Sequence, residues 1–324
     1  MLIDINTFEK YIPKNFNNFV VGLSGGADSL CLTLLMDEYV KLNNFKLFAC
    51  IVDHKLRKES STEILPIIKI LGNKNINYKV LVWKHEEINT KVELAARQAR
   101  YNLLYEFCKS IGSDCLCTAH HALDQWETFF MRLSRGSGVR GLSSIYSVSH
   151  FRDIKLLRPL LPFTPQDIKD TLKYTFNITE YVRDSMNYDD KFERVKWRKS
   201  YELLSNSKYN LSIKNVNTSI NRIQRANDCI DSILQSIINN IYINNYLNLK
   251  LFKEQHIEIQ IRILKYIINS FFPEKQIISY DLLDRMTHLI TSTNFNATNF
   301  CHLVFKRIKN KQIKIYIENR QRNS

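Results

Sequence analysis

The chain is poor in the residues that mark fibrous, low-complexity and disulfide-stapled proteins. Its 324 residues include only 8 glycines and 6 prolines, which excludes a collagen-like or low-complexity chain. Seven cysteines, an odd number without regular spacing, argue against a disulfide framework. Four of them stand in apolar surroundings, where we expect reduced core thiols: Cys31, Cys50, Cys115 and Cys117. The composition indicates a globular protein, and its length suggests about two domains.

Long hydrophobic runs and acidic charge are also scarce. No apolar run reaches the roughly 18 residues that a membrane-spanning helix needs. Residues 1–14 carry acidic side chains where a signal peptide would be basic and then hydrophobic. We therefore expect a cytoplasmic protein with no membrane partner. The 46 Lys and Arg outnumber the 32 Asp and Glu, and the net charge of +14 attracts polyanions such as nucleic acids.

Short apolar runs alternate with longer helical stretches in the first half of the chain. The expected strands are residues 19–23, 46–53, 78–83 and 113–120. The expected helices between and after them are residues 28–41, 62–73, 92–111 and 124–134. Strands that are apolar on both faces lie inside a sheet covered by helices. The pattern predicts an α/β fold in which a parallel sheet has helices on both faces.

The second half of the chain has a different pattern. Apolar residues, isoleucines with one alanine, recur every three or four residues between Ile220 and Ile238, which predicts a helix with one apolar face. Residues 282–290 also favour a helix, whereas strict alternation in residues 258–263 leaves strand and helix open. Two alternating runs around residues 309–311 predict a β-hairpin. The expected domains are an α/β domain and a smaller, mainly helical domain with a terminal β-hairpin: residues 1–205 and residues 206–324.

The most specific motif is Ser24-Gly25-Gly26-Ala27-Asp28-Ser29, which directly follows an expected strand and directly precedes an expected helix. Two glycines let the chain turn tightly and bring backbone N–H groups against phosphate oxygens, and the helix start adds partial positive charge. The Ser24 and Ser29 hydroxyls can donate further hydrogen bonds. The Asp28 carboxylate can hold the Mg²⁺ that accompanies a nucleoside triphosphate. The alternative is an ordinary tight turn with an aspartate cap; the motif is neither a Walker loop nor a dinucleotide fingerprint.

This motif resembles the phosphate-binding loop of the N-type ATP pyrophosphatases, the PP-loop superfamily, whose members cleave ATP between the α and β phosphates. Further motifs follow in one order, and together they resemble the tRNA(Ile)-lysidine synthetases over about the first 200 residues. They are Val52-Asp53-His54-Lys55-Leu56-Arg57, Ala95-Ala96-Arg97-Gln98-Ala99-Arg100-Tyr101, Ala119-His120-His121, Asp124-Gln125-Trp126-Glu127-Thr128, Arg135-Gly136-Ser137-Gly138, Arg158-Pro159-Leu160-Leu161 and Asp184-Ser185-Met186-Asn187.

Two positions depart from the family pattern. Leu123 stands before Asp124 where the family usually has a second acid. The usual R-N-x-x-R near the end of the domain reads Arg194-Val195-Lys196-Trp197-Arg198, which keeps both arginines and loses an amide. These changes put in doubt the role of the first acid and of that amide.

The resemblance implies an enzyme that uses ATP and Mg²⁺ to join L-lysine to the wobble cytidine of tRNA(Ile) with a CAU anticodon. The cytidine C2 oxygen attacks the α phosphate of ATP, pyrophosphate leaves, and the lysine ε-amine then displaces AMP. Negative charge spread over phosphate oxygens calls for loop amides, Mg²⁺ on Asp28 and a cation such as Arg97 or Arg100. For Arg97, a surface ion pair with Glu93 is the alternative.

The second step requires lysine to be bound as an ammonium and then deprotonated. Asp124 and Glu127, three residues apart on one helical face, suit recognition of the ammonium, and either His120 or His121 suits the proton transfer. A structural role is the alternative for the two histidines. Val52 and His54 end the second strand, where they are expected to meet the nucleotide, or else to stabilise the loop.

RNA binding is expected from basic residues beyond the ATP site. They are Arg135, in a loop that is either a phosphate contact or a solvent loop, then Arg194 and Arg198, and the terminal Lys306, Arg307, Lys309 and Lys311. Two alternatives remain: a tRNA thiolase of the same superfamily, although the chain has no CxxC, and a non-catalytic basic tRNA-binding protein. A homodimer is compatible with the sequence, which does not determine the oligomeric state.

Overall fold

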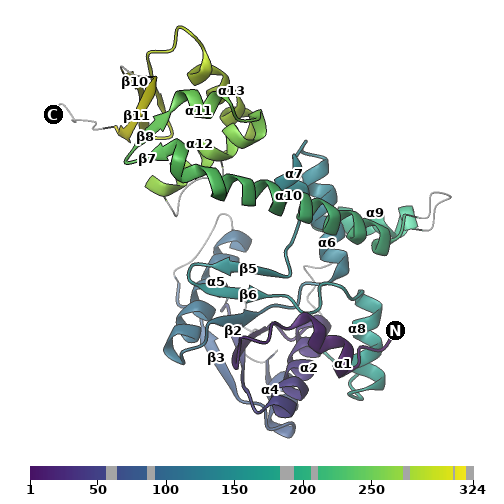
Figure 1. Cartoon of the computed structure of the whole chain (residues 1–324). Coiled ribbons are helices and arrows are strands. Elements are labelled where there is room, and N and C mark those ends of the chain that lie inside the picture. The colour runs from purple at the N-terminus through teal and green to yellow at the C-terminus, as the bar shows by residue number, and fades with distance from the viewer. Residues whose placement is uncertain are drawn as a thin grey trace. The chain divides into compact units, whose positions relative to one another are not determined.

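The computed structural model describes residues 1–55, 64–85, 92–182, 193–205, 211–272, 278–308 and 311–318. The chain forms two compact units, which Figure 1 shows with their elements labelled. The first comprises Met1–Arg135 and Ser143–Ile220, and the second comprises Gly136–Leu142 and Asn221–Ser324. None of the described helices is long and apolar enough to cross a membrane.

A six-stranded, mostly parallel sheet forms the centre of the first unit. Its strands are β1 (Asn18–Leu23), β2 (Lys46–Asp53), β3 (Tyr78–Val82), β4 (Cys115–Cys117), β5 (Val148–Phe151) and β6 (Ile154–Leu157). Their spatial order is β3-β2-β1-β4-β6-β5, and only β5 runs antiparallel to its neighbour. The predicted parallel sheet is confirmed. The strand expected at residues 113–120 is shorter, because the chain leaves the sheet after Thr118 to begin the next helix.

Helices cover both faces of this sheet, as predicted. One face carries α2 (Ala27–Asn43), α4 (Leu65–Asn73), α8 (Pro165–Tyr174) and the short α1 (Ile5–Phe8) with the 3₁₀ helix η1 (Glu9–Tyr11); the other carries α5 (Val92–Ser110). Alternate strand residues serve the two faces. Phe19 and Val21 of β1 lie in the larger core with α2, whereas Val20 packs with Leu104 of α5.

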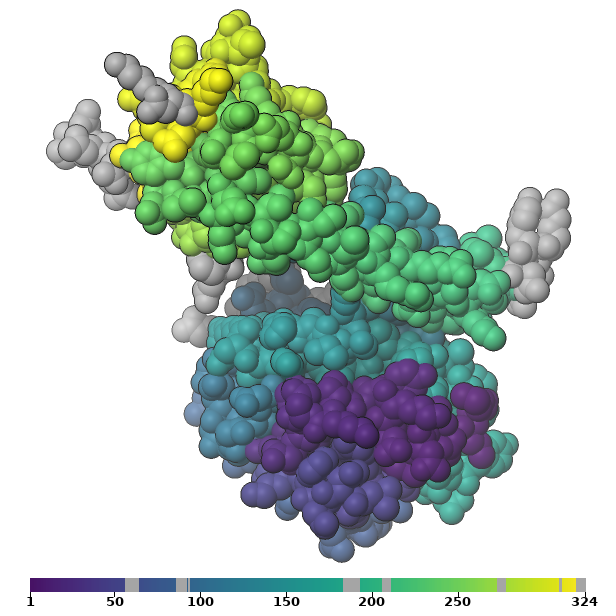
Figure 2. Space-filling view, viewed as in Figure 1, coloured from purple at the N-terminus to yellow at the C-terminus, as the bar shows by residue number. Residues whose placement is uncertain are grey.

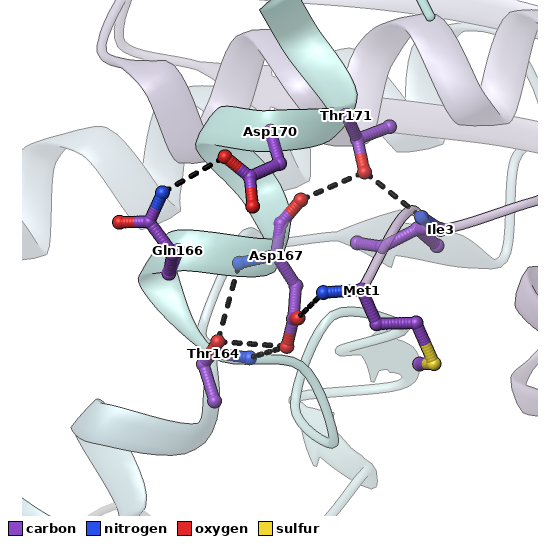
Figure 3. A network of polar contacts seen from close by, with 7 residues as sticks. All are labelled: Met1, Ile3, Thr164, Gln166, Asp167, Asp170 and Thr171. Atoms are coloured by element: carbon purple, nitrogen blue, oxygen red, sulfur yellow. Dashed lines mark hydrogen bonds and ion pairs between the residues drawn. The ribbon is translucent and has the colours of Figure 1, made fainter. Parts of the chain in front are cut away.

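The N-terminal residues are tied to α8 (Figure 3). The amine of Met1 lies 2.7 Å from Asp167 Oδ1, and the backbone N–H of Ile3 donates to Thr171 Oγ1 at 2.9 Å. Thr171 in turn donates to the carbonyl of Asp167 at 2.7 Å. The space-filling view shows the purple N-terminal residues against the teal residues of the same unit (Figure 2). These contacts fasten the first residues of the chain to α8.

Two further helices complete the first unit next to β4. They are α6 (Ala122–Leu133) and α9 (Glu193–Ser205), which pack against the start of α10 (Ile213–Ile241). Trp126 is fully buried in this contact, 4.4 Å from the ring of Phe130 and 5.1 Å from that of Tyr201. The aromatic cluster holds α9 against α6.

The second unit combines helices with an antiparallel sheet. Besides α10 and the short α7 (Val139–Leu142), it contains α11 (Leu249–Lys253), α12 (Ile257–Phe271), α13 (Tyr280–Thr291) and the strands β7 (Tyr242–Ile243), β8 (Tyr246–Asn248), β9 (Ala297–Phe300), β10 (Leu303–Ile308) and β11 (Gln312–Ile317). The predicted hairpin is confirmed as β10 and β11, and it lies inside a sheet of order β7-β8-β11-β10-β9.

Residues 258–263, which periodicity left undecided, are helical in α12. Ile259, Ile261 and Ile263 are all buried although they alternate, because α12 is covered by protein on most of its circumference. A helix enclosed in this way does not need a polar face, so its pattern can imitate that of a strand. The four cysteines expected in a core are free thiols and buried.

Candidate functional site

The strand order reverses between β1 and β4, which is where open α/β sheets bind their ligands. β1 pairs with β2 on one side and with β4 on the other, with Val21 opposite Cys117. The loop after β1, residues 24–26, therefore meets residues 118–121 after β4 at the same sheet edge. The motif singled out in the sequence lies at this point.

The loop that joins β1 to α2 is held from its inner side. The buried Ser29 hydroxyl donates to the carbonyl of Gly26 at 3.1 Å and accepts from the Ser24 backbone N–H at 3.2 Å. Gly25 has φ of +89°, and a Cβ there would lie 2.2 Å from Ile67 Cδ1. The Ser24 residue is exposed, and Gly26 provides no side-chain cap for α2. The first N–H groups of a 17-residue helix are thus left available to an anion.

His121 joins this loop to α6 through two carboxylates. Its Nε2 lies 3.6 Å from Asp28 Oδ2, and its Nδ1 lies 3.4 Å from Asp124 Oδ2. The Asp124 carboxylate also accepts the His121 backbone N–H at 2.8 Å, across the first turn of α6. Burial disfavours the charged imidazole, but Asp124 and Asp28 outweigh it and raise the pKa of His121 to about 9. His121 is therefore an imidazolium between two carboxylates at neutral pH.

The neighbouring His120 has the opposite character. Its ring lies 3.0 Å from Thr118 Oγ1, measured from Nδ1. Burial lowers the pKa of His120 to about 4, and Arg158 and Arg97 act in the same direction against Asp124. His120 is therefore neutral at physiological pH, whereas His121 holds its proton. Of the two histidines expected near the lysine amine, only His120 has a nitrogen lone pair to accept a proton.

Glu127 is engaged by an arginine from α9. Its Oε1 lies 2.8 Å from both Nε and Nη2 of Arg198. Burial and the charge of Asp124 raise the pKa of Glu127 although Arg198 opposes them. Glu127 Oε2 is enclosed and has no hydrogen-bond partner among the described residues. From the sequence, Glu127 was expected to bind lysine and Arg198 to bind RNA. Nothing in the sequence around either residue indicates that they pair across 71 positions.

The residues expected around the nucleotide lie near the ends of β2 and α5. His54 stacks edge-to-face against Trp83, with ring centroids 6.0 Å apart, and its Nδ1 has no partner among the described residues. Burial and the nearby Arg100 lower the pKa of His54. Arg97 is exposed, with its guanidinium 5.2 Å from the Tyr101 ring centroid. The side chain of Glu93, its alternative partner, lies outside the described residues.

The basic residues expected to bind RNA differ in whether their side chains are exposed or already bonded to other residues. Arg135 forms an ion pair with Glu193, and Arg194 is exposed. Arg307 donates to the carbonyl of Thr293 at 2.9 Å and so supports a turn of its own unit. Of the terminal lysines, Lys306 and Lys311 are exposed, whereas Lys309 lies outside the described residues. The motif at residues 184–187 also lies outside them.

The donor set fits a metal that arrives with a nucleotide. Among the described residues, no three His, Cys, Asp or Glu side chains form a group that could hold a metal ion on their own. A Mg²⁺ that is coordinated mainly by phosphates and water needs only one or two protein carboxylates. The Asp28 side chain, 41% exposed at the start of α2, offers such a carboxylate beside the loop.

Comparison with known proteins identifies the domain that carries this site. A family model described as a PP-loop domain matches residues 3–202. The tRNA(Ile)-lysidine synthase of Wolbachia pipientis wMel is 34% identical over 78% of this chain and 59% of its own length. That of Orientia tsutsugamushi is 31% identical over 76% of this chain and 58% of its own length. The chain thus spans just under three fifths of these two relatives.

Two further matches extend the comparison. The tRNA(Ile)-lysidine synthase of Rickettsia prowazekii is 28% identical over 96% of this chain and 74% of its own length. Among solved structures, the U34-tRNA thiolase NcsA of Methanococcus maripaludis is similar with a TM-score of 0.55 and 18% identity. This match covers 68% of the chain and 77% of the thiolase. At that identity the likeness concerns the fold alone.

Proposed function

The chain belongs to the PP-loop domain family, and we propose that it is a ligase that uses ATP to join L-lysine to the wobble cytidine of tRNA(Ile) with a CAU anticodon. Relatives named tRNA(Ile)-lysidine synthase support this substrate class. The observation that carries the proposal is the convergence of Asp28, His121 and Asp124 beside the loop of residues 24–26. In this arrangement the carboxylates lie at the same sheet edge as the turn that we propose to bind phosphate.

For the first step, we propose that the loop binds the phosphates of ATP. The Ser24 hydroxyl and the first backbone N–H groups of α2 would donate to phosphate oxygens, with Asp28 holding Mg²⁺. When bound, Mg²⁺ would supply positive charge that stabilises the developing negative charge on the phosphates. His121 positions the Asp28 carboxylate through its charged ring. Residues 52 and 54, together with Arg100, would surround the rest of the nucleotide.

For the second step, we propose that Asp124 and Glu127 bind the lysine ammonium. Arg198 occupies only Oε1 of Glu127, which leaves Oε2 as an acceptor without a partner among the described residues. Burial alone would raise the pKa of Asp124, but the charged His121 ring and the His121 backbone N–H outweigh it, so the pKa is lowered and Asp124 stays charged. The neutral His120 would accept the proton that the ammonium loses before its amine attacks.

We propose that residues 1–205 form the catalytic domain and that residues 206–324 contribute to tRNA binding. In the second unit, Lys306 of β10 lies directly opposite Lys314 of β11, and both are exposed. Lysines placed opposite each other repel, so the arrangement is favourable when an anion lies over the strands. Arg194 of the first unit is a further exposed cation for phosphates.

A lysine-transfer assay tests the proposal. The protein is incubated with ATP, labelled L-lysine and two tRNA(Ile) transcripts that differ only in the wobble base, cytidine or uridine. We expect label on the cytidine transcript alone, with one pyrophosphate released per lysine incorporated. The proposal fails if pyrophosphate release does not depend on the tRNA, or if both transcripts are labelled equally.

The thiols of the first unit do not favour sulfur transfer as a second function. Cys115 and Cys117 are both fully buried in β4, and the contact with Cys115 together with burial raises the pKa of Cys117 well above its ordinary value. A thiol in this state is a poor nucleophile, because the thiolate is the reactive form. The likeness to the Methanococcus thiolase is therefore a likeness of fold.

A further inference from the structure

Arg158 is a buried cation for which the described residues supply no acidic partner. It is 8% exposed and follows β6 at the carboxyl end of the sheet. Its Nη1 donates to the carbonyl of Tyr146 at 2.7 Å and to Ser149 Oγ at 2.9 Å, both neutral acceptors. Its Nε is enclosed and has no hydrogen-bond partner among the described residues. A guanidinium is not deprotonated in proteins, so this residue carries a positive charge that its described hydrogen-bond partners do not compensate.

Such a residue calls for an explanation. Removing an ion from water is costly unless an opposite charge or a full set of hydrogen bonds replaces the lost hydration. The neighbours that act on the charge of Arg158 are Tyr101 and Arg97, and the second of these is another cation. No carboxylate of the described part of the chain lies within ion-pair distance of Arg158. The described part of the chain therefore holds positive charge here that none of its own carboxylates neutralises.

The fold places this charge next to the candidate active site. β4 and β6 are parallel neighbours, with Cys117 opposite Leu157, so Thr118 and Arg158 both leave the sheet at the same edge. The Thr118 backbone N–H still donates to the carbonyl of Leu157 at 2.9 Å. Thr118 Oγ1 lies 3.0 Å from the ring of His120. Arg158 is thus one strand away from the segment that carries both histidines.

Arg97 approaches the same edge from α5. It lies in the second turn of that helix, with its guanidinium over Tyr101, whose ring centroid is 5.4 Å from that of Phe151 in β5. Phe151 pairs with Ile154 at the turn of the β5–β6 hairpin, and Arg97 lies one helical turn before Tyr101. Because α5 leads into the amino end of β4, the first turns of α5, with Arg97, lie towards the carboxyl edge of the sheet, where Arg158 ends the hairpin. The positive character of this corner also shows in His120, since burial first and then Arg158 and Arg97 lower its pKa to about 4.

We propose that Arg158 and Arg97 form a subsite for a phosphate group at the carboxyl end of β6, beside His120. The two neutral acceptors fix the plane of the Arg158 guanidinium before the ligand arrives, which reduces the entropy lost on binding. The subsite rests on the proposed function, because the phosphate comes either from the RNA backbone next to the reacting cytidine or from the nucleotide. Both sources have the same chemistry, and separate binding measurements distinguish them.

Three variants of the full chain test the subsite. Arg158→Gln and Arg97→Gln remove one charge each from the corner. Arg152→Gln removes a charge from the turn between β5 and β6, at the other end of the same hairpin, where Arg152 lies 4.6 Å from the Tyr105 ring centroid and 3.7 Å from Glu106. Arg97 is exposed, so its variant remains informative even if Arg158→Gln does not fold, which circular dichroism would show.

Binding is measured in two arms that do not require catalysis. One arm uses a tRNA(Ile) transcript without nucleotide over a range of salt concentrations, and the other uses an ATP analogue with a methylene bridge between the α and β phosphates, without RNA. If the phosphate belongs to RNA, each subsite variant lowers tRNA affinity about tenfold and reduces the salt slope by about 0.7, the value for one single-strand contact. If it belongs to the nucleotide, the analogue binds about tenfold more weakly instead.

Either result supports the subsite, provided that Arg152→Gln changes neither arm. Unchanged affinity in both arms for folded Arg158→Gln and for Arg97→Gln would overturn it, and so would an equal loss in Arg152→Gln. Failure of the lysine-transfer assay together with a subsite effect in the binding arms would reject the proposed function and retain the phosphate subsite.

Discussion

At the scale of single residues, the candidate site depends on two adjacent histidines with opposite protonation states. His121 is charged because two carboxylates outweigh its burial, and His120 is neutral because burial and nearby arginines outweigh Asp124. The sequence shows both as members of one His-His pair. Their difference arises from Asp28, Asp124, Arg97 and Arg158, which lie far apart in the sequence, so the sequence alone could not assign the two protonation states.

The neutral state of His120 predicts a pH dependence of stability. The unfolded chain takes up a proton near pH 6.5, whereas the folded chain does so near pH 4, so the unfolded state binds more protons between these values. The contribution of the neutral His120 to the free energy of unfolding is therefore complete above about pH 6.5. It decreases as the pH falls towards 4, by at most about 3 kcal/mol. We expect His120→Asn to flatten this part of the curve in urea unfolding at several pH values. An unchanged slope in the variant would show that His120 is not buried as a neutral ring.

The sequence offered Asp28, His121 and Asp124 as site residues from three separate motifs, and the fold brings their side chains together. Their roles in the chemistry stay predictions. Arg158 had no assigned role, because a basic residue after a strand carries no sign of burial. The pairing of Glu127 with Arg198 was missed for the same reason: it depends on how α9 packs on α6.

At the scale of elements, the loop between β1 and α2 depends on one glycine and not on its neighbour. At Gly25 a side chain would need φ near +89° and would overlap Ile67. At Gly26 the nearest atom to an added Cβ is 3.9 Å away, and φ is −69°. Gly25→Ala should therefore lower the free energy of unfolding by about 2 kcal/mol. Gly26→Ala should change it by less than about 0.5 kcal/mol in the same denaturant titration.

The two substitutions form a matched pair, since both add one methyl group to the same turn. If they destabilise the protein equally, the strain at Gly25 is not what shapes the loop. Ile67→Ala destabilises the core by itself, because Ile67 is buried, so the double variant is compared with Ile67→Ala alone. In that background the overlap is removed and the unfavourable φ is left, so we expect partial recovery of the cost of Gly25→Ala. No recovery would assign the whole effect to the backbone conformation.

The strands β10 and β11 are part of a larger sheet, and this limits how their role can be tested. Sequence patterning predicted the hairpin, but not that β11 is the central strand between β8 and β10. Phe305, Ile313 and Ile315 are fully buried in the core of the second unit. Deleting the hairpin would therefore unfold that unit, and a surface charge change is the sharper test of its role.

Lys306→Glu provides that test, because it replaces repulsion across the strands with attraction to Lys314. We expect the second unit to gain up to about 1 kcal/mol in stability. Affinity for tRNA should fall, with a shallower salt dependence, because a phosphate contact is lost. Lys253→Glu, on the exposed part of α11, makes the same charge change away from the strands. Equal losses of affinity in both variants would show that only net charge matters.

At the scale of the whole chain, the sequence predicted the order of elements better than their extent. The alternation of apolar runs gave the parallel sheet and its covering helices, because buried strands and helices differ in length and period. It did not show β5 and β6, whose 4 residues each are too short to have a recognisable period. In the five-stranded sheet of the second unit, the sequence did not predict β7 and β8, because their 2 and 3 residues are also too few to show a period.

We propose that the loop after β1, with the Asp28 carboxylate beside it, binds the ATP that is cleaved, whereas RNA binds through other residues. It is tested most directly by comparing Asp28→Asn with the unaltered protein, measuring pyrophosphate release in the presence of tRNA and lysine and, separately, tRNA affinity. We expect release to fall by about 100-fold or more with tRNA affinity nearly unchanged. Pyrophosphate release at the unaltered rate, or an equal loss of release and of tRNA affinity, would contradict it.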